Sequence, residues 1–334
     1  NKTPFWLLNY CRLESKRMCG IAGFCNTSED YTKNYTKWHH TLYKMRQVLM
    51  HRGPDDEGEL LAEQIGMAHT RLSIIDINRG HQPMTKQKFG NSYTIVYNGE
   101  LYNTAELRDQ LVRMGYLFKT YTDTEVILTG FMAFGSEFVK ELNGIFSFGI
   151  WDENRHVLYL ARDRFGVKPL FYTVIDHTIV FGSEIKALFE YPGMKPRVTK
   201  EGLCEIFGLG PAKTYGKGVF KDIYEVLAGN IITFDSNGLT QKPYWSLSSK
   251  PHEDSYQETV EKTSYLLYDA VKRQMISDIP ICTLLSGGVD SSLVTAICAK
   301  VQKETGNRLR TYSFDFTDNV KHFQSNFFQP TQDR

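Results

Sequence analysis

A cysteine directly after a methionine is the residue of this sequence best placed for chemistry. If Met18 is the true start, its removal before a small side chain makes Cys19 the first residue. Cys19 would then carry a thiol together with a free α-amine, whose pKa of roughly 7.7–8.0 lets it take the thiol proton. The resulting thiolate is the nucleophile. The apolar run at 20–24 predicts a buried strand that would hold it rigidly, although a plain strand with a chance cysteine has the same residues.

Four further residues could assist a thiol that hydrolyses an amide. Asn98 and Gly99 follow a predicted strand and offer a side-chain amide and a backbone N–H to an oxyanion, but Asn-Gly is also a common hairpin turn. Arg71 could bind a carboxylate through two parallel hydrogen bonds, or it could be a surface charge. Asp123 could bind an ammonium group, or it could only favour the start of a helix. Each residue taken alone therefore has a structural explanation.

A second candidate site is the turn Ser286-Gly287-Gly288 between a predicted buried strand and a predicted helix. Backbone N–H groups at the positive end of a helix bind phosphate or pyrophosphate, and Ser291 and Ser292 add hydroxyl donors. Asp290 would repel phosphate unless Mg²⁺ or the helix terminus compensates. The turn fits neither the G-x-x-x-x-G-K-[ST] loop nor the G-x-G-x-x-G loop. The alternative is an ordinary strand-to-helix turn capped by Ser286 and Asp290.

The elements that must position these residues fall into two groups along the chain. In the first group strands and helices are segregated, which predicts an α+β layered domain. Its predicted strands lie at 20–24, 93–97, 146–151, 156–161, 170–174 and 178–181, with a strand and turn at 66–75, and its helices lie at 37–50, 103–114, 123–134 and 183–189. Asn103 with Glu106, and Thr122 with Glu125, are expected to cap two helices. We expect the strand at 93–97 to end at Asn98, and a less regular segment to follow residue 189.

The second group begins after a polar segment at 241–255, rich in Ser, Lys and Pro, which is expected to be a linker. A long helix at about 256–277 follows the linker. A strand at 281–285, the glycine turn, a helix at 293–301 and a strand at 310–314 come next. This order predicts a βαβ unit with a parallel sheet.

Length and composition narrow the class of protein. The 334 residues suffice for two ordinary domains, and 41% hydrophobic with 23% charged residues is typical of globular chains. A net charge of +1 provides no electrostatic footprint for nucleic acid or an anionic membrane. The six cysteines lack paired metal-ligand spacing and favour a reducing compartment without disulfides. No apolar run approaches the ~18 residues that a membrane span requires.

Several segments, taken together, resemble the class II (N-terminal-nucleophile) glutamine amidotransferases. The turn at 285–292 resembles a pyrophosphatase-type ATP loop, and the combination is similar to the glutamine-dependent asparagine synthetases of the bacterial type. The matching segments, in order, are Met18-Cys19-Gly20-Ile21, His51-Arg52-Gly53-Pro54-Asp55, His69-Thr70-Arg71-Leu72-Ser73-Ile74, Tyr97-Asn98-Gly99-Glu100-Leu101-Tyr102-Asn103, Thr122-Asp123-Thr124-Glu125, Arg162-Asp163-Arg164-Phe165-Gly166-Val167-Lys168-Pro169-Leu170, Ser183-Glu184-Ile185-Lys186-Ala187-Leu188 and Leu285-Ser286-Gly287-Gly288-Val289-Asp290-Ser291-Ser292.

The resemblance implies a role for each matching position. Cys19 would attack the side-chain amide of glutamine, with Asn98 and Gly99 as the oxyanion hole. Glutamine would be bound by Arg71 at its α-carboxylate, by Glu100 and Asp123 at its α-amine, and by the adjoining residues Leu72, Ser73, Ile74 and Ile75. In the second group Leu285 and Phe314 would flank the adenine or ribose of ATP. The pyrophosphate would lie among Ser286, Gly287, Gly288, Val289, Asp290 and Ser291.

The resemblance also implies the fold and the reaction. Residues 18–240 would form an αββα N-terminal-nucleophile sandwich, and residues 256–334 the start of an α/β parallel-sheet domain of the ATP pyrophosphatase type. ATP would activate aspartate as an aspartyl-adenylate, and ammonia from glutamine would displace AMP to give asparagine. The implied substrates are glutamine, aspartate and ATP with Mg²⁺, without a metal held by the protein alone. A cytoplasmic location and a homodimer are further expectations.

Two features depart from the family pattern. Residues 1–17, interpreted as a non-native leader or a pro-segment, would acylate the amine of Cys19 and remove its base. The synthetase part is shorter than in the family, so we expect a partial domain that does not fold properly by itself. Two alternatives therefore stay open: a related amidotransferase with another carboxylate acceptor, and a non-catalytic binding module.

Overall fold

The computed structural model describes residues 18–88, 90–209, 214–314, 321 and 323–325. Its contacts divide the chain into two units, the first ending at Ser248 and the second beginning at Ser249. This division falls inside the predicted linker at 241–255. The first residues of that segment continue a strand, β12 (Gly238–Pro243). The leader predicted at 1–17 lies outside the described residues.

The first unit is built on two antiparallel sheets of six strands each. One sheet has the order β10-β8-β9-β1-β3-β2 and the other β12-β11-β7-β6-β5-β4. The strands of the first sheet are β1 (Gly20–Cys25), β2 (Asp56–Leu61), β3 (Ile65–Arg71), β8 (Phe171–Ile175), β9 (Thr178–Gly182) and β10 (Tyr224–Glu225). Those of the second are β4 (Met84–Lys88), β5 (Asn91–Leu101), β6 (Gly144–Asp152), β7 (Val157–Arg162), β11 (Asn230–Asp235) and β12.

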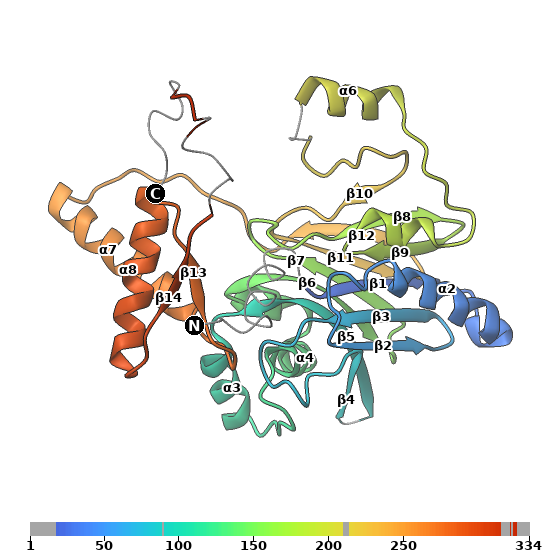
Figure 1. Ribbon diagram of the computed structural model, residues 1–334. Coiled ribbons are helices and arrows are strands. Elements are labelled where there is room, and N and C mark those ends of the chain that lie inside the picture. The colour runs from blue at the N-terminus through green and yellow to red at the C-terminus, as the bar shows by residue number, and fades with distance from the viewer. Residues whose placement is uncertain (1–17, 89, 210–213, 315–320, 322, 326–334) are drawn as a thin grey trace, which may run out of the picture. The chain divides into compact units, whose positions relative to one another are not determined.

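Helices cover the outer face of each sheet, as Figure 1 shows. The first sheet is covered by α2 (Tyr35–Gln47) and α5 (Ile185–Phe189), and the second by α3 (Thr104–Arg113) and α4 (Asp123–Phe134). Short 3₁₀ turns η1 (Tyr31–Asn34) and η2 (Gly135–Glu141) adjoin α2 and α4, and α6 spans Lys200–Leu209. The predicted α+β sandwich with αββα layers is therefore confirmed.

Three hydrophobic clusters correspond to the three contacts between these layers. Apolar side chains alternate along each strand, so that one set enters the space between the sheets and the other contacts a helix layer. Between the sheets lie Ile21, Met67, Val96, Trp151 and Phe181. Because β1 and β3 are buried along their whole lengths, the residues at their ends are held by the core on both faces.

The prediction that a strand ends at Asn98 is wrong. Strand β5 continues to Leu101, and Asn98 and Gly99 pair with Ser147 and Phe146 of β6. A Cβ on Gly99 would lie 2.4 Å from the carbonyl oxygen of Ile145. The glycine therefore serves a close approach between two strands rather than a hairpin turn.

Helices α3 and α4 begin after the expected residues, Asn103 and Thr122, but only Thr122 makes a capping hydrogen bond. Thr122 accepts the N–H of Glu125 at 3.2 Å and begins α4, as expected. Asn103 precedes α3 but makes no capping bond, because its side chain donates to the carbonyl of Glu141 and accepts the N–H of Asn143. Asn103 thus fastens the start of α3 to the end of η2.

The segment after residue 189, for which no regular element was expected, contains α6 and strands β10 to β12. These strands pair with β7, β8 and each other. Their partners β7 and β8 precede them by roughly fifty residues or more, a separation across which local pattern carries little signal.

The second unit has the predicted helix, strand, turn, helix and strand. Its elements are α7 (Tyr256–Arg273), β13 (Cys282–Leu284), α8 (Val289–Glu304) and β14 (Arg310–Tyr312). Strands β13 and β14 are parallel, as the βαβ pattern predicts. Helix α7 begins in a capping box formed by Ser255 and Glu258, and it ends four residues before the predicted Ser277.

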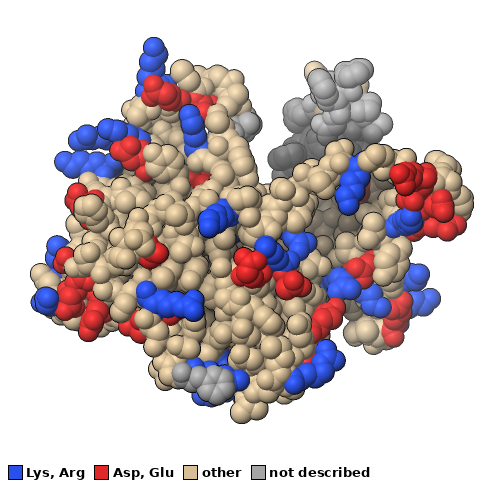
Figure 2. Space-filling view, turned by 180° about the vertical axis from the view of Figure 1, so that it is seen from behind, with Lys and Arg blue, Asp and Glu red and all other residues tan. Residues whose placement is uncertain are grey.

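The surface charge and the helices of the described residues fit the near-neutral, globular composition of the chain. Basic and acidic side chains are interspersed on the face shown in Figure 2. None of the helices in the described part of the chain is long and apolar enough to cross a membrane.

Candidate active site

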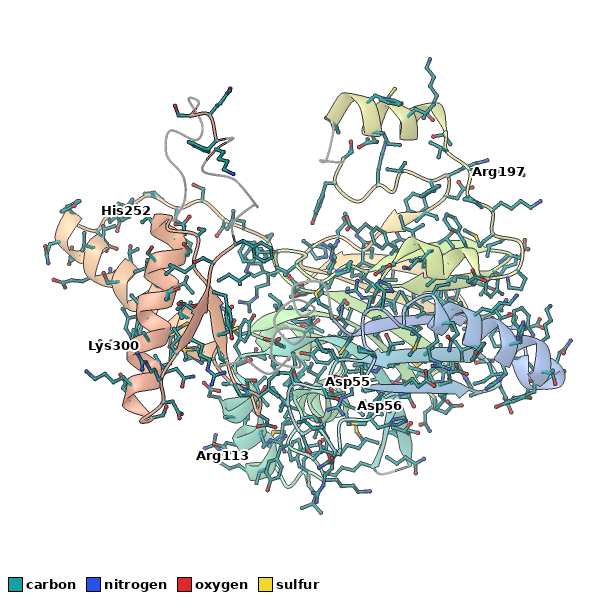
Figure 3. The ribbon with its side chains drawn as sticks, viewed as in Figure 1. Asp55, Asp56, Arg113, Arg197, His252 and Lys300 are labelled. Atoms are coloured by element: carbon teal, nitrogen blue, oxygen red, sulfur yellow. The ribbon has the colours of Figure 1, made fainter. Side chains whose placement is uncertain are left out.

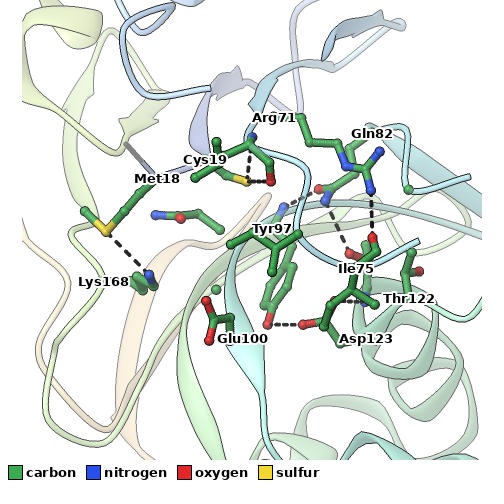
Figure 4. A pocket seen from close by; sticks show the side chains of 16 residues that line it. Met18, Cys19, Arg71, Ile75, Gln82, Tyr97, Glu100, Thr122, Asp123 and Lys168 are labelled. Atoms are coloured by element: carbon green, nitrogen blue, oxygen red, sulfur yellow. Dashed lines mark hydrogen bonds between the residues drawn. The ribbon is translucent and has the colours of Figure 1, made fainter. Parts of the chain in front are cut away.

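The residues proposed for amide chemistry meet at one end of the first unit's two sheets. A cavity of about 100 Å³ lies where β1 begins, where β3 ends and where β5 approaches α4 (Figure 4). Nine of the expected residues line it: Cys19, Arg71, Leu72, Ile74, Ile75, Asn98, Gly99, Glu100 and Asp123. Positions more than a hundred residues apart in the sequence are thus brought together.

Ser73 is the expected glutamine-site residue that the structure places elsewhere. Its backbone N–H donates to Asp55 at 2.8 Å, and it lines a second cavity of about 580 Å³ together with Asp56 and His81. Arg71 lines both cavities. Asp55 and Asp56 come from the turn before β2 and its first residue (Figure 3).

Cys19 is held on both sides of its sulfur. The thiol donates to the carbonyl of Leu72 at 3.6 Å, and Sγ accepts the Leu72 N–H at 3.4 Å. The carbonyl of Cys19 accepts Arg52 Nε at 3.0 Å. Burial raises the pKa of the thiol, whereas the Leu72 N–H and the cations of Lys168 and Arg71 act in the opposite direction. The sulfur therefore depends on a base and on nearby positive charge to ionise.

Asn98 supplies a donor without a partner. The residue is 1% exposed, and no described group accepts a hydrogen bond from its Nδ2. Buried amides are nearly always hydrogen-bonded, so such an orphan donor marks a place for an acceptor. A donor aimed into a cavity next to a thiol is suited to an oxyanion that forms during attack on an amide.

Arg71 is partly committed to the adjoining loop. Its guanidinium donates to the carbonyls of Ile75 at 2.9 Å, Asp76 at 2.9 Å and Ile77 at 2.8 Å. A guanidinium has five N–H donors, so two remain for a ligand in the cavity. A Cβ on Gly80 would lie 2.0 Å from the Arg71 NH2 nitrogen, which explains a glycine there.

Asp123 is oriented by three donors. Its carboxylate accepts the Tyr97 hydroxyl at 2.8 Å, the Leu101 N–H at 3.2 Å and the Thr124 N–H at 2.8 Å. Burial raises the pKa of Asp123, and the Tyr97 hydroxyl opposes that shift. A fixed carboxylate beside Glu100 at one end of the cavity is suited to an ammonium group.

Tyr97, which the sequence did not single out as a site residue, links several of these groups. Its backbone N–H donates to Gln82 Oε1 at 2.7 Å, and its carbonyl accepts His69 Nε2 at 3.0 Å. Burial lowers the pKa of His69 to about 3, so this ring is neutral and Nε2 carries the proton. Tyr97 therefore fixes both Asp123 and the backbone that precedes Asn98.

Other lining residues were also missed as site residues. They are Met18, Gly80, Gln82, Thr122, Thr124 and Lys168. Gln82 carries no local signal, because only tertiary contacts place it in the cavity. Lys168 has a signal, since it belongs to one of the matching segments, at 162–170.

The turn at 285–291 occupies the expected place between β13 and α8. The N–H of Leu285 donates to the carbonyl of Tyr312 at 2.8 Å, and Ser286 Oγ lies 3.0 Å from Ser291 Oγ. Gly287 has φ +91°, a conformation that suits glycine. The cap residue of α8 is Gly288, without a side-chain capping bond, so the alternative of capping by Ser286 and Asp290 is wrong.

The expected ATP residues surround this turn without being buried. Phe314 is 86% exposed and Val289 84% exposed. The turn lies at the carboxyl end of β13, where ligands bind in open α/β sheets. Asp290 with three serine hydroxyls fits a Mg²⁺ ion that is bound mainly by substrate phosphates. In the described part of the chain no cluster of three or more His, Cys, Asp or Glu could hold a metal by itself.

Comparison with known families agrees with this geometry. Residues 18–245 match the family model described as glutamine amidotransferase domain. The chain belongs to this glutamine amidotransferase family. Residues 262–326 match a second model, described as asparagine synthase. The glutamine amidotransferase match begins at Met18, one residue before the thiol, and ends just after β12.

The curated relatives of this glutamine amidotransferase include asparagine synthetases. Asparagine synthetase (glutamine-hydrolyzing) 3 of Bacillus subtilis is 46% identical over 317 residues, covering 95% of this chain and 51% of the relative. Asparagine synthetase (glutamine-hydrolyzing) 1 of the same organism is 35% identical, covering 90% and 46%. The chain thus spans about half the length of these relatives. A solved glutamine phosphoribosylpyrophosphate amidotransferase of B. subtilis is 17% identical, covering 93% of this chain and 69% of its own, with a TM-score of 0.47.

Proposed function

We propose that this chain serves glutamine-dependent asparagine synthesis: glutamine hydrolysis at Cys19 supplies ammonia to an aspartyl-adenylate formed with ATP. The observation that carries the first step is the single cavity shared by Cys19, Asn98, Arg71 and Asp123. The second step is supported by the exposed turn at 285–291 and by the asparagine synthase match at 262–326.

The hydrolytic step follows from the groups in the cavity. With Cys19 as the first residue, its α-amine takes the thiol proton, and the thiolate forms a C–S bond to the side-chain carbonyl carbon of glutamine. Asn98 Nδ2 and the Gly99 N–H would donate to the oxyanion. Collapse breaks the C–N bond, and ammonia leaves with the proton from the α-ammonium group. Water then cleaves the C–S bond, which releases glutamate and restores the thiol.

The charged ends of glutamine fit the remaining cavity residues. The two unused N–H donors of Arg71 would bind the α-carboxylate. Asp123, with Glu100, would bind the α-ammonium group. The loop residues Leu72, Ile74 and Ile75 would line the aliphatic part, whereas Ser73 would stabilise the loop through Asp55.

In the second unit the substrates would be ATP and aspartate. Leu285 and Phe314 would flank the adenine or ribose. The pyrophosphate would lie among Ser286, Gly287, Gly288, Val289, Asp290 and Ser291. Mg²⁺, held by Asp290 and the phosphates, would neutralise their charge. The aspartate carboxylate attacks the α-phosphorus and releases pyrophosphate, and ammonia then displaces AMP to give asparagine.

Location and assembly are part of the same proposal. The cysteines of the described part of the chain are free thiols, which supports a cytoplasmic location. A homodimer is proposed by resemblance, and light scattering of the purified chain would test it. An acceptor other than aspartate is not favoured, since both B. subtilis relatives are named asparagine synthetases.

The test compares the 334-residue chain with a form that begins at Cys19. The shorter form is expected to release glutamate and ammonia from glutamine in equal amounts, because its amine is free. The full chain and a Cys19→Ala variant of the shorter form are expected to be inactive. A Cys25→Ala variant is the matched control, since Cys25 lies in the core away from the cavity. Equal rates for the Cys19→Ala variant and its parent would refute the proposal.

A further inference from the structure

Lys168 is a buried cation with an unusual partner. Its side chain is part of the cavity that contains Cys19, and the residue is only 7% exposed. Nζ donates to the sulfur of Met18 at 3.4 Å (Figure 4). Among the described residues, none of the ion pairs of the first unit includes Lys168. Lysines are rarely buried without a carboxylate partner, so this charge has a use other than an ion pair.

The backbone of Lys168 is fixed by the two residues that begin its segment. Arg162 donates to the carbonyls of Lys168 and Gly166, each at 2.7 Å. The buried carboxylate of Asp163 accepts four backbone N–H groups, including those of Val167 at 3.0 Å and Lys168 at 2.9 Å. A loop built in this way places the lysine side chain rigidly.

Charged groups face both Cys19 and Lys168 from several elements. Around the thiol the cations are Lys168 and Arg71, and the anion is Asp123; Arg52 binds the Cys19 carbonyl. Around Lys168 the anions are Glu100 and Asp163, and Arg52 is the further cation. The charge of Lys168 lowers the pKa of the Cys19 thiol more than the charge of Arg71 does. Of these two cations, the sequence had pointed only to Arg71.

We propose that Lys168 supplies the fixed positive charge that makes Cys19 reactive. The inference rests on the proposed function and adds a residue to it. Because Nζ contacts the side chain of Met18, the charge lies on the amino side of Cys19, where the α-amine is generated when Met18 is removed. A cation there favours the thiolate and disfavours a protonated amine, so the amine stays available as the base at neutral pH. Lys168 acts through Cys19 and is thus a positioning residue.

The test measures the reactivity of Cys19 itself in the 334-residue chain. Alkylation by iodoacetamide is followed by mass spectrometry of the peptide containing Cys19, between about pH 6 and about pH 10. Lys168→Met is expected to slow alkylation about tenfold near neutral pH and to move the profile to higher pH by about one unit. Lys168→Arg retains the charge and should keep the parent profile. Lys33→Met removes an equal charge from an 81% exposed side chain and is the control.

A second arm uses the form that begins at Cys19 and measures glutamine hydrolysis. Lys168→Met is expected to lower kcat about tenfold with little change in KM. An unchanged alkylation profile in Lys168→Met would overturn the inference even if glutamine is hydrolysed, and so would a rise in KM alone, which would make Lys168 a substrate ligand. If Lys168→Arg loses reactivity like Lys168→Met, the role is structural and the inference is also overturned. A shifted profile in Lys168→Met, together with no release of ammonia by the form that begins at Cys19, would support the inference and refute the proposed function.

Discussion

The buried amide of Asn98 has no partner for its nitrogen in the described part of the chain, and its neighbour across the strands, Ser147, has an unpartnered hydroxyl. Both side chains lie on the same face of the second sheet, because residues paired across two strands share a face. Two unpaired polar groups in a core have a cost that a ligand would remove. At the scale of the residue, the cavity is therefore built for an acceptor that the folded chain does not itself contain.

Removal of the Asn98 amide should affect the rate more than the binding of glutamine. For Asn98→Ala in the form that begins at Cys19, we expect kcat for glutamine hydrolysis to fall about 10²–10³-fold with KM nearly unchanged, because the oxyanion exists only in the transition state. Asn237→Ala, in an exposed turn, is the matched control. A similar fall in both variants, or a change in KM alone, would contradict the assignment.

At the scale of the element, helix α4 with its Thr122 cap and the position where α3 begins were predictable, because capping residues and apolar periodicity act locally. The candidate site was predictable only in part. Cys19, Arg71 and Asp123 stand at element ends, which sequence can locate. Gln82 and Tyr97 were missed, because their roles arise from hydrogen bonds across more than ten residues. Asn98 was expected at a turn, since Asn-Gly pairs cannot by themselves distinguish a hairpin from a close strand contact.

Strand pairing at Gly99 predicts a change in stability. In Gly99→Ala the new methyl group would meet the Ile145 carbonyl, and we expect unfolding free energy to fall by about 1–3 kcal/mol. Urea unfolding followed by tryptophan fluorescence measures this, because the tryptophans of the described residues, Trp38, Trp151 and Trp245, all lie in the first unit. Gly208→Ala in α6 has nothing within 4 Å of the new Cβ and should be nearly neutral. Equal effects would show that the contact between β5 and β6 is not rigid.

The connection between α5 and the loop after α2 predicts a pH dependence. Glu184 accepts Arg52 at 2.9 Å, and although burial favours its neutral form, hydrogen bonds from Arg52, Lys186 and His51 lower its pKa to about 2. A lowered carboxyl pKa stabilises the fold above the unfolded value of about 4.3, and this contribution is lost as pH falls toward about 2.

Glu184→Gln is therefore expected to lower unfolding free energy by about 1–2 kcal/mol at neutral pH and by about half as much near pH 3. Urea unfolding at the two pH values measures the difference. Glu190→Gln, after α5, serves as the control. A loss that is equal at both pH values would mean that shape, rather than charge, is what the Arg52 contact requires.

At the scale of the whole molecule, the two units differ in how much of them is buried. The first has three hydrophobic clusters, whereas helix α7 of the second has no buried residue and Leu266 is 62% exposed. Tyr244 and Trp245 both donate backbone N–H groups to the carbonyl of Gly229. The Trp245 ring packs on the Phe165 ring, with 5.3 Å between the ring centroids. The first unit should thus be stable at least to Trp245, a few residues beyond the boundary that the sequence suggested.

Limited proteolysis is expected to leave a core that begins near Met18 and ends between about residues 245 and 255, while the second unit is cut within α7 or α8. Mass spectrometry of the fragments identifies the ends, and retained tryptophan fluorescence shows that the core is folded. Equal protection of both units, or a core that ends before β12, would contradict this division.

The three loop carbonyls bound by Arg71 have a consequence for affinity. A side chain that becomes ordered only when its ligand binds loses conformational freedom, and this loss weakens binding. Here the guanidinium is already immobilised against Ile75, Asp76 and Ile77 with two donors remaining. The entropy of arranging this receptor is thus lost during folding of the polypeptide rather than during capture of a ligand, so the glutamine that we propose as substrate would meet a preorganised site.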